Sequence, residues 1–549
     1  MRPLKQQLTL RGVLIGVVGA VVLTCSSMFV ALKASSLPWP IMFVTLISVF
    51  SLRALGKTNE NEINVTHTIM SAGSMVAGGL AFTLPGIFIL NNDAVVSVTE
   101  IFAVTLGGTV LGLVFTALLR AHFIEKAKMP YAMGQAAARV VKIVGMDDAD
   151  VYVGDDLTGA KAVGTLAGSF GISGIFTWLR DWAGSVPSVS WFAPMQKYGS
   201  FGGIWWSPML MSVGYLVGTG TVSVWFLGAL IGDFGFLIGG QSLLGWSADF
   251  AAGVKSSAGL GWMVGVGLAI TGGEILPKIK EIFGGVMGVG RDEKSLMPLG
   301  LAGIVVLGCA LVFIFVLDLP VLAVIITVLG ALLTTAMSSQ CVGQSGINPM
   351  EVFGIFVMAA AKVICSLDVR SAVFVAAITA IAAGLTGDVM NDFKSGSILG
   401  SSPRAQWIGE CIGGIIGAVV ACGVLLVLIS AYGGGVFGSE MFPAAQAAAV
   451  ASVVGGIANL PVFFGALLLS VIIYFITPAF TMLGLGIYLP FYLSLTAFTG
   501  GAVRFIFNKF CPGLSRGNAG DIAASGLLAG EGFIGVVVAL IQAFGMLRR

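Results

Sequence analysis

Two carboxylates, an amide and an ammonium lie close together in TGDVMNDFKSGSILGSSPRAQW, residues 386–407. In a helix Asp388 and Asp392 would stack at i and i+4, with Asn391 on the next turn from Asp388. Lys394 would supply a nearby positive charge. Burial and mutual repulsion favour a protonated carboxyl, whereas a lysine favours the ionised form. Such a balanced group can exchange protons near neutral pH, so we assign proton coupling to Asp388, Asp392 and Lys394. The alternative is a solvated loop with a salt bridge.

A second polar group begins a long apolar run. In GKTNENEINVTHT, residues 56–68, Glu60 and Asn64 are spaced i, i+4 and Asn61 and Asn64 are spaced i, i+3. On a helix they share one face. We expect Glu60, Asn61 and Asn64 to contact a substrate at the rim of the bilayer. The alternative is a hydrophilic loop whose asparagine caps the following helix.

A third group interrupts two apolar runs in QCVGQSGINPMEVF, residues 340–353. Gly-Gln-Ser-Gly followed by Asn-Pro breaks a helix, and unwound backbone at membrane depth is tolerated only where it is buried in protein or lines a cavity. We therefore expect Gln344, Ser345, Asn348 and Glu351 to face a substrate. The alternative is an ordinary polar turn between two spans.

Further acidic residues lie in apolar surroundings. Glu274 follows a Gly-Gly break, and we add it to the proton-coupling group. Asp233, Glu410 and Glu531 also begin or interrupt apolar segments. The chain contains only 2 histidines, so a proton pathway must depend mainly on carboxylates.

Two short patterns are typical of enzymes but lack the rest of the machinery. G-Q-S-G at 343–346 has the form of an intramembrane serine protease site, which requires a histidine base within reach of the serine. His67 and His122 both lie far upstream. The G-K-T at 56–58 lacks the first glycine of a phosphate-binding loop, because that position is Ser51. We predict no catalytic residue and no enzyme activity.

Composition defines the class of protein that must position these groups. Of 549 residues, 57% are hydrophobic and 10% are charged, against about 25% charged in soluble domains. This predicts an all-α polytopic membrane protein in contact with the lipid bilayer. The net charge of +2 without a basic stripe excludes a nucleic-acid partner. The 7 cysteines lack the spacing of a metal site or a disulfide framework, and we predict no cofactor and no resident metal.

Apolar runs recur along the whole chain. Runs of about 18 residues or more are candidate spans, and we expect about 14 to 16 crossings, some of them broken or re-entrant. Two of these expected spans, 371–386 and 408–432, flank the first polar group. Glycine, at 78 residues, is roughly twice as frequent as usual, which suits close helix packing and hinges.

Basic residues predict the orientation. They gather at the N-terminus (Arg2, Lys5, Arg11) and in the loop 278–294, whereas 91–100 contains none. Positively charged loops face the cytoplasm, so we expect a cytoplasmic N-terminus in the cell (inner or plasma) membrane. The Trp-rich segment 181–205 is expected to form an aromatic cap on the other side.

Weak internal similarity favours a duplicated architecture. GQSGINP at 343–349 resembles NENEINV at 59–65, and SPMLMSVGYL at 207–216 resembles TPAFTMLGLG at 477–486. Both offsets are near half the chain length, as in repeat-built transporters. We expect two related helical halves, 1–275 and 276–549, within a single membrane unit.

Several motifs resemble one known family. GDVMNDFKSG at 387–396, continued by Ser-Pro-Arg at 402–404, is similar to the G-D-x-M-x-D-F-K-x-G and S-P-R signature of the oligopeptide transporter family, particularly its yellow-stripe-like branch. Asn-Glu-Asn at 59–61 looks like that branch's Q-E-N segment, with Asn59 in place of the glutamine. Pro130 and Gly134 match its P-x3-G-x-A element.

The resemblance implies a secondary, proton-coupled importer with about 16 helices. Its cargo would be a small peptide or a metal complex of an amino-acid-like chelator. A channel remains the alternative and would need a continuous polar pore; an intramembrane protease is the other. The partners expected are the substrate, protons and lipid, and the sequence leaves a homo-oligomer open.

Overall fold

The structure is a computed structural model that describes residues 3–34, 41–145, 159–200, 202–270, 272–273, 296–345, 348–455, 458–510 and 519–547. Glu274, assigned to proton coupling, lies outside the described residues. Gln344 and Ser345 form the end of a helix, but their side chains are also outside the described part of the structure.

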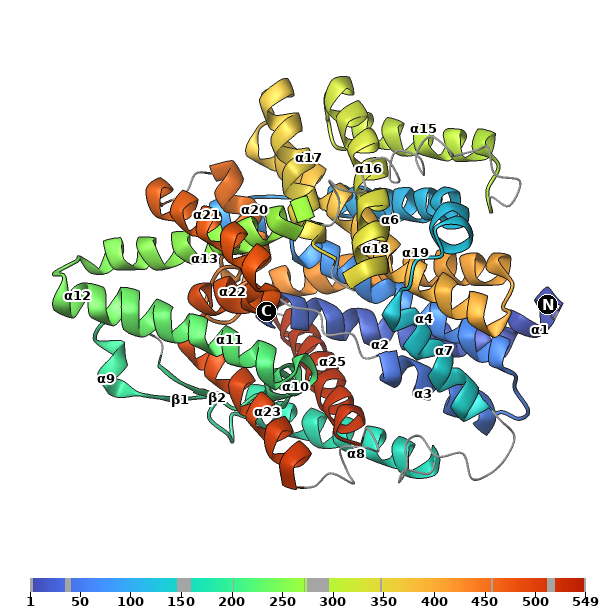
Figure 1. Cartoon of the computed structure of the whole chain (residues 1–549), viewed down its shortest axis with the longest axis horizontal. Coiled ribbons are helices and arrows are strands. Elements are labelled where there is room, and N and C mark those ends of the chain that lie inside the picture. Colours follow the sequence, from blue (N-terminus) through green and yellow to red (C-terminus); the bar gives the residue numbers. More distant parts are fainter. Residues whose placement is uncertain are drawn as a thin grey trace.

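The chain is almost entirely helical (Figure 1). The first part contains α1 (Leu4–Gln7), α2 (Leu10–Ala34), α3 (Ile41–Ala54), α4 (Glu60–Ala81), α5 (Gly86–Leu90), α6 (Val98–Arg120), η1 (Ala121–Lys126), α7 (Ala132–Gly145), α8 (Gly159–Thr177), η2 (Trp178–Trp182), β1 (Val189–Trp191), α9 (Ala193–Gln196), β2 (Gly203–Trp205), α10 (Pro208–Val217), α11 (Thr219–Ala229), η3 (Leu230–Gly239), α12 (Gly240–Leu243) and α13 (Ala248–Ile270). The second part contains α15 (Leu299–Phe315), α16 (Val321–Ser345), α17 (Met350–Cys365), α18 (Val369–Leu399), α19 (Pro403–Tyr432), η6 (Gly434–Val436), α20 (Ala445–Gly455), α21 (Leu460–Ile476), η7 (Pro478–Met482), α22 (Leu483–Tyr488), α23 (Phe491–Phe510) and α25 (Ala519–Leu547).

Membrane-spanning helices dominate the described residues. Seven helices there are long and apolar enough to cross a membrane, among them α2, α16, α18 and α19, and shorter apolar helices accompany them. Several apolar side chains on α15 and α21 are more than half exposed, among them Ile304, Phe315, Leu468 and Ile476, as expected of surfaces that face lipid. The predicted all-α polytopic membrane fold is confirmed, and the number of crossings stays a prediction.

Helix α18 is the central element. Asp368 caps its N-terminus by accepting a hydrogen bond from the Arg370 amide, and Gly400, in the left-handed conformation, ends it. The alanine-rich sequence between them favours an uninterrupted helix. The helix packs against α4, α6, α7, α16 and α17. The predicted span 371–386 therefore continues through the first polar group, which is helical rather than a loop.

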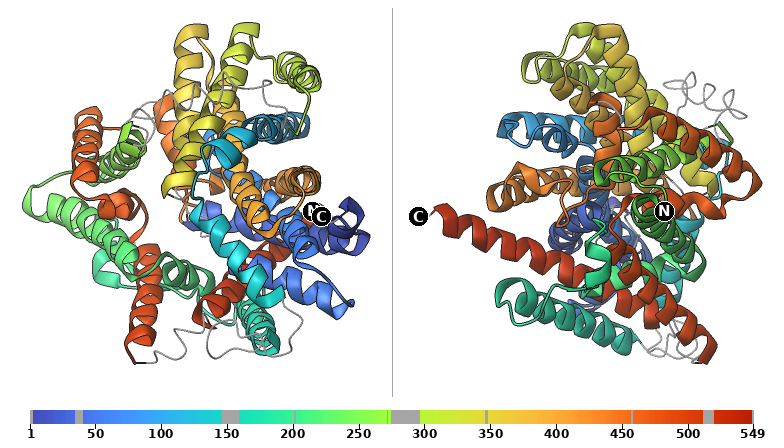
Figure 2. Two further views of the ribbon diagram at one scale, coloured as in Figure 1. Left: turned by 45° about the vertical axis from the view of Figure 1, so that its right-hand side comes forward. Right: turned by 90° about the vertical axis from the view of Figure 1, so that its left-hand side faces the viewer.

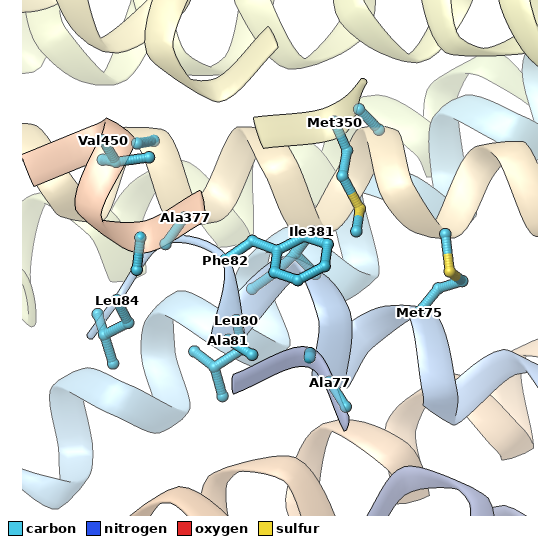
Figure 3. Packing of buried hydrophobic residues seen from close by; sticks show 14 of the residues in the cluster. Met75, Ala77, Leu80, Ala81, Phe82, Leu84, Met350, Ala377, Ile381 and Val450 are labelled. Atoms are coloured by element: carbon cyan, nitrogen blue, oxygen red, sulfur yellow. The ribbon is translucent and has the colours of Figure 1, made fainter. Parts of the chain in front are cut away.

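The apolar core surrounds the middle of α18. Figure 3 shows Phe82 and Leu84, which follow α4, close to Ile381 and Ala377 of α18 and to Met350 of α17. All five side chains are buried. Helices from distant parts of the sequence thus form one core.

The two expected halves of the chain interleave. Helix α25 lies beside α2 and α8, and α23 lies beside α10 and α11 (Figure 1). Beyond its neighbours, the C-terminal part of α25 extends away from the other helices (Figure 2). The halves are therefore not separate bodies, and the duplication stays a prediction.

Two broken helices cross at close range. Gly218, with φ of +96°, separates α10 from α11, and residues 489 and 490 separate α22 from α23. A Cβ atom at Gly214 would overlap the Ala497 carbonyl oxygen, and one at Gly500 would overlap that of Met211. Glycine permits this close approach of backbones. Each of these two apolar stretches is therefore divided into two helices.

Candidate functional site

Two buried carboxylates and a half-buried one meet between α18 and α19. Asp388 and Asp392 lie one turn apart on α18, as the i, i+4 spacing predicts. Glu410 of α19 is fully buried and faces Asp392. Within the described residues, neither oxygen of Glu410 nor Oδ2 of Asp388 has a hydrogen-bond partner. These oxygens can each accept a proton or a hydrogen bond.

Helix α4 supplies the other groups of this cluster. The Ser71 hydroxyl donates a hydrogen bond of 2.9 Å to Oδ2 of Asp392. His67, one turn earlier, is 2% exposed. Asp392 lies close enough to interact with the His67 imidazole electrostatically. Nδ1 of His67 has no hydrogen-bond partner among the described residues. We name Asp388, Asp392, Glu410, His67 and Ser71 the acid cluster.

The predicted amide group of α4 lies beside this cluster. Asn64 accepts a hydrogen bond of 2.7 Å from Ser395 and donates one of 3.3 Å to Ser401. Asn61 accepts one of 2.9 Å from Ser401. Asn61 and Asn64 thus share one face, as predicted, and that face contacts the turn from α18 to α19. Glu60 is half-buried and takes no part in these hydrogen bonds.

An asparagine of this stretch does cap the following helix, as the alternative interpretation expected, although residues 60–68 form the helix and not a loop. The Asn59 side chain accepts hydrogen bonds from the amides of Asn61 and Glu62, which caps α4. Glu62 forms a 2.7 Å ion pair with Arg11 of α2 and accepts hydrogen bonds from Thr9 and Thr58. Residues 58–64 therefore join the start of α4 to the start of α2 and place two asparagines against the end of α18.

Asn391 and Lys394 have positions that the sequence did not predict. The Gly134 amide donates to Oδ1 of Asn391 at 3.1 Å, and the Asn391 side chain donates to the Gly387 carbonyl. Asn391 therefore attaches α7 to α18. Lys394 is half-buried, and within the described residues it forms no ion pair with Asp388 or Asp392. The expected counter-charge is not in contact with the carboxylates.

The third polar group divides into two environments. Asn348 accepts a hydrogen bond from Ser338 at 3.1 Å and donates to the carbonyls of Ala383 and Gly384 at 3.1 and 3.3 Å. It thereby holds the start of α17 one turn from Asp388. Glu351 lines a cavity of about 190 Å³ together with Asn348 and Gln446. The chain does break here, because α16 ends at Ser345 and α17 begins at Met350.

Motifs far apart in sequence thus converge on one place. Asn61 and Ser401 are 340 residues apart and are hydrogen-bonded; Gly134 and Asn391 are 257 residues apart and are hydrogen-bonded. These residues belong to the stretches that carry the family resemblance. A profile of the family described as "OPT oligopeptide transporter protein" matches residues 7–268 and 293–542. The chain belongs to the oligopeptide transporter family.

Curated relatives agree with this membership. A "putative oligopeptide transporter" of Haemophilus influenzae is 24% identical over 93% of this chain and 91% of its own length. From rice (Oryza sativa subsp. japonica), the "probable metal-nicotianamine transporters" YSL13 and YSL5 are 29% and 30% identical. Those matches cover 26% and 29% of this chain and only 22% and 27% of the rice proteins.

Family membership decides the class of activity. This oligopeptide transporter family member is a multi-pass membrane transporter and not an enzyme. Within the described residues, no group of three or more His, Cys, Asp or Glu side chains is arranged to hold a metal ion.

Sequence reasoning gave little weight to two members of the acid cluster. Glu410 was one of several acids in apolar segments, and His67 was considered only as a distant base. The signal available was the spacing of Gly409, Gly413 and Gly417 around Glu410. Small residues four apart mark a helix face that a neighbour approaches closely.

Proposed function

We propose that this transporter is a secondary active, proton-coupled importer of small oligopeptides or of metal complexes of amino-acid-like chelators. The names of the relatives in Haemophilus and rice support these two classes of cargo. The observation that carries proton coupling is the acid cluster, in which Asp392 and Glu410 are buried, Asp388 is half-buried, and none of the three carboxylates forms an ion pair within the described residues. Buried carboxylates in a transporter are most often ion or proton sites.

Proton binding changes the contacts between the helices. A proton on Glu410 can bridge to Asp392, so that Asp392 receives hydrogen bonds from both Glu410 and Ser71. Without that proton, two carboxylates of like charge face each other in a medium of low dielectric constant, and the repulsion drives α18 and α19 apart. Protonation therefore favours the closed arrangement and proton release favours separation.

The proposed substrate-facing residues lie in two regions, the break between α16 and α17 and the start of α4. Asn348 and Glu351 line one cavity, and Asn348 is hydrogen-bonded one turn from Asp388. We assign substrate contact to Gln344, Ser345, Asn348 and Glu351, and we retain Glu60, Asn61 and Asn64 at the start of α4. Glu274 is kept as a further proton-coupling candidate.

The orientation follows from charge. With the N-terminus on the cytoplasmic side of the cell membrane, the Arg11–Glu62 pair and the turn from α18 to α19 lie at the cytoplasmic end of the helix bundle. The acid cluster is then nearer the cytoplasm, where an importer releases its proton.

The test uses purified protein in liposomes with an imposed pH gradient. Uptake of a labelled tripeptide, and separately of iron–nicotianamine, is measured for wild type, Glu410→Gln and Asp392→Asn. Wild type should concentrate one cargo only with the gradient. Both variants should lose gradient-driven uptake and retain exchange of cargo across the membrane, because the neutral side chain imitates the protonated acid.

The control variant is Asp93→Asn, at an exposed carboxylate in the loop before α6. It should transport as wild type does. Uptake that is indifferent to the gradient in wild type, or gradient-driven uptake that survives Glu410→Gln and Asp392→Asn, would refute proton coupling through the acid cluster.

A further inference from the structure

A buried lysine that forms no ion pair with the described residues lies near the C-terminal end of α2. Lys33 is 8% exposed. Its Nζ lies 4.4 Å from the ring centroid of Trp205, 4.7 Å from that of Phe29 and 5.5 Å from that of Phe442. Within the described residues it forms no salt bridge and donates no hydrogen bond.

Leaving an ammonium in this state is costly. A buried charge that lacks a partner loses its hydration without compensation, and such groups are normally paired. Cation–π contacts with aromatic rings compensate for only part of that loss. An ammonium has three N–H donors, and the rings leave them without an acceptor. A ligand carboxylate would supply both the charge and the acceptors.

Lys33 lines a cavity together with residues of η2, the β1–β2 hairpin and the loop after α19. The volume of this cavity is about 460 Å³, within the range of small-molecule sites, about 300 to 1,000 Å³. Tyr432 and Tyr492 contribute to its wall. Glu440 and Met441, which are exposed, also line it. The cavity therefore reaches the surface at the loop that follows α19.

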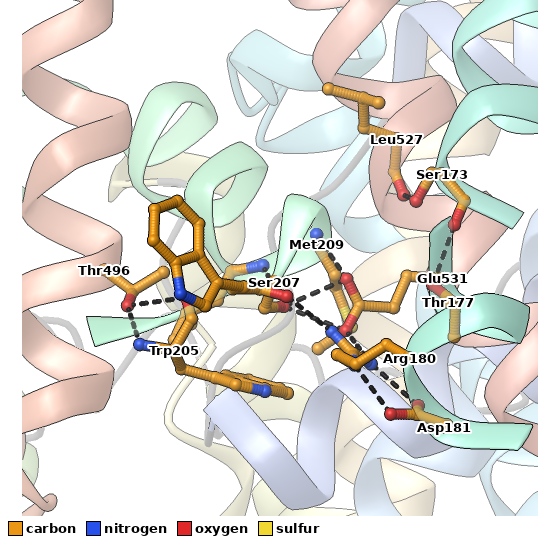
Figure 4. A network of polar contacts seen from close by, with 12 residues as sticks. Ser173, Thr177, Arg180, Asp181, Trp205, Ser207, Met209, Thr496, Leu527 and Glu531 are labelled. Atoms are coloured by element: carbon orange, nitrogen blue, oxygen red, sulfur yellow. Dashed lines mark hydrogen bonds and ion pairs between the residues drawn. The ribbon is translucent and has the colours of Figure 1, made fainter. Parts of the chain in front are cut away.

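The neighbouring charges are already paired with one another. Arg180 makes two hydrogen bonds to Asp181, of 2.6 and 2.7 Å, and an ion pair of 2.9 Å with Glu531 (Figure 4). Glu531 also accepts hydrogen bonds from the Ser207 hydroxyl and the Met209 amide. This network fixes the wall of the cavity and leaves Lys33 as its available cation.

The same wall offers a place for a positive ligand group. Burial raises the pKa of Asp181, but hydrogen bonds from Arg180 and the charge of Lys33 outweigh it, and the net pKa is lowered. Asp181 therefore stays ionised. Because Asp181 is held by Arg180, Glu440 is the carboxylate of this cavity that can meet a positive ligand group, while Lys33 supplies the ammonium. That combination suits a ligand that carries both a carboxylate and an amino group.

We propose that Lys33 binds the carboxylate of an amino-acid-like ligand in this cavity. The inference rests on the proposed function and deepens it, because both a peptide C-terminus and an amino-acid chelator carry this group. Gly19 of α2 lies against Met70 of α4, next to Ser71 of the acid cluster, and Lys33 lies 14 residues further along α2, which is about 20 Å at 1.5 Å per residue. With a cytoplasmic N-terminus, the cavity is the entry site on the outer face.

The first test is ligand discrimination by the full-length wild-type protein in detergent, measured by titration calorimetry. The probes are alanine tripeptide, its C-terminal amide, and iron–nicotianamine. A carboxylate held by Lys33 predicts that the free acid binds about 10- to 100-fold more tightly than the amide, because a hydrogen bond to a charged group contributes that much. Preference for the tripeptide or for the chelate identifies the source of the carboxylate.

The second test assigns the discrimination to Lys33. Lys33→Met should weaken binding of the preferred carboxylate ligand by about 10- to 100-fold, and Lys33→Arg should retain part of the affinity. The matched control is Lys197→Met, since Lys197 also lies over an aromatic ring, at 5.1 Å from Tyr198, but is exposed. Ligand should change wild-type tryptophan fluorescence, and Trp205→Phe should remove most of that change.

Three results would overturn the inference: equal binding of acid and amide by wild type, no binding of any probe, or unchanged affinity in a folded Lys33→Met protein. If Lys33→Met does not fold, the wild-type discrimination and the Trp205 signal still decide. Lys33-dependent binding without gradient-driven uptake would refute the proposed transport function alone. Gradient-driven uptake with no role for Lys33 would refute this inference alone.

Discussion

The close contact between α4 and α19 should require glycine, which has only a hydrogen atom as its side chain, at the positions where the two backbones meet. A Cβ at Gly413 would overlap the carbonyl oxygen of Ile69 and lie 2.9 Å from its carbon, where ordinary contact begins at 3.4 Å. The neighbour is backbone, so the helices must separate by more than about 0.5 Å. Overpacking of this kind costs about 1 to 3 kcal/mol. Glu410, one turn before Gly413, would move away from Asp392 and Ser71.

A matched substitution isolates this steric cost. Gly423 lies on the same helix with nothing within 4 Å of its built Cβ. Both Gly→Ala changes gain the same helix propensity, about 1 kcal/mol, so the difference between the two variants is the steric cost alone. Thermal unfolding in detergent should place Gly413→Ala below Gly423→Ala by about 1 to 3 kcal/mol.

Uptake in liposomes gives the functional half of this prediction. Gly413→Ala should reduce gradient-driven uptake, because the contact between Glu410 and Asp392 opens, whereas Gly423→Ala should transport as wild type does. If Gly413→Ala is as stable as Gly423→Ala and shows wild-type pH dependence, then the close approach of α19 to α4 does not position the acid cluster, and the reasoning is refuted.

Two further predictions concern the polar contacts. Asn64→Ala removes the hydrogen bonds to Ser395 and Ser401 inside the protein and should lower the free energy of unfolding by about 1 to 3 kcal/mol, measured by thermal unfolding. Glu531→Ala leaves the buried guanidinium of Arg180 with one carboxylate in place of two, and should cost about 3 kcal/mol in the same measurement.

Each of these changes has a control in a less buried setting. Asn92→Ala, at an exposed asparagine, should leave stability unchanged. Asp521→Asn breaks a half-exposed pair with Arg504, 3.5 Å apart, and should cost at most about 1 kcal/mol. Equal losses for Glu531→Ala and Asp521→Asn would contradict the view that burial makes the Arg180 pair important.

The sequence predicted the elements of the candidate site better than their partners. The i, i+4 spacing of Asp388 and Asp392 and the i, i+3 spacing of Asn61 and Asn64 are local properties of a helix, and both are confirmed. The approach of Glu410 depends on contacts between helices far apart in the chain. The spacing of residues along the sequence does not determine how close α19 brings Glu410 to Asp392.

Two errors have clear physical causes. The apolar run before Asp388 suggested that the span ended there, but an N-capped helix rich in alanine continues through polar residues when other helices bury them. Lys394 was expected beside the carboxylates because it is close in sequence. On a helix, position 394 is about 200° away from position 392, so the lysine points to the other side.

The sequence did not indicate a role for Lys33, because a lysine at the end of a span usually extends to the membrane surface. Its burial requires the Trp205 hairpin and the loop after α19, which are more than 170 residues away in sequence. The Trp-rich segment 181–205 was expected to cap the bundle. Its β1–β2 hairpin places Trp205 against the lysine, while Trp182, Trp191 and the adjoining Trp206 are exposed, and the cap stays a prediction.

Helix α2 connects the two proposed sites mechanically. Glycines at positions 12, 16 and 19 bring its backbone against Thr66, Ile69 and Met70 of α4, on the segment that carries His67 and Ser71. Nearer Lys33, the Ser26 hydroxyl donates to the Ala529 carbonyl of α25, the helix that carries Glu531. Backbones packed this closely move together. If a ligand held by Lys33 and a proton held by Glu410 both bias this helix packing, then by linkage each changes the affinity for the other by the same factor.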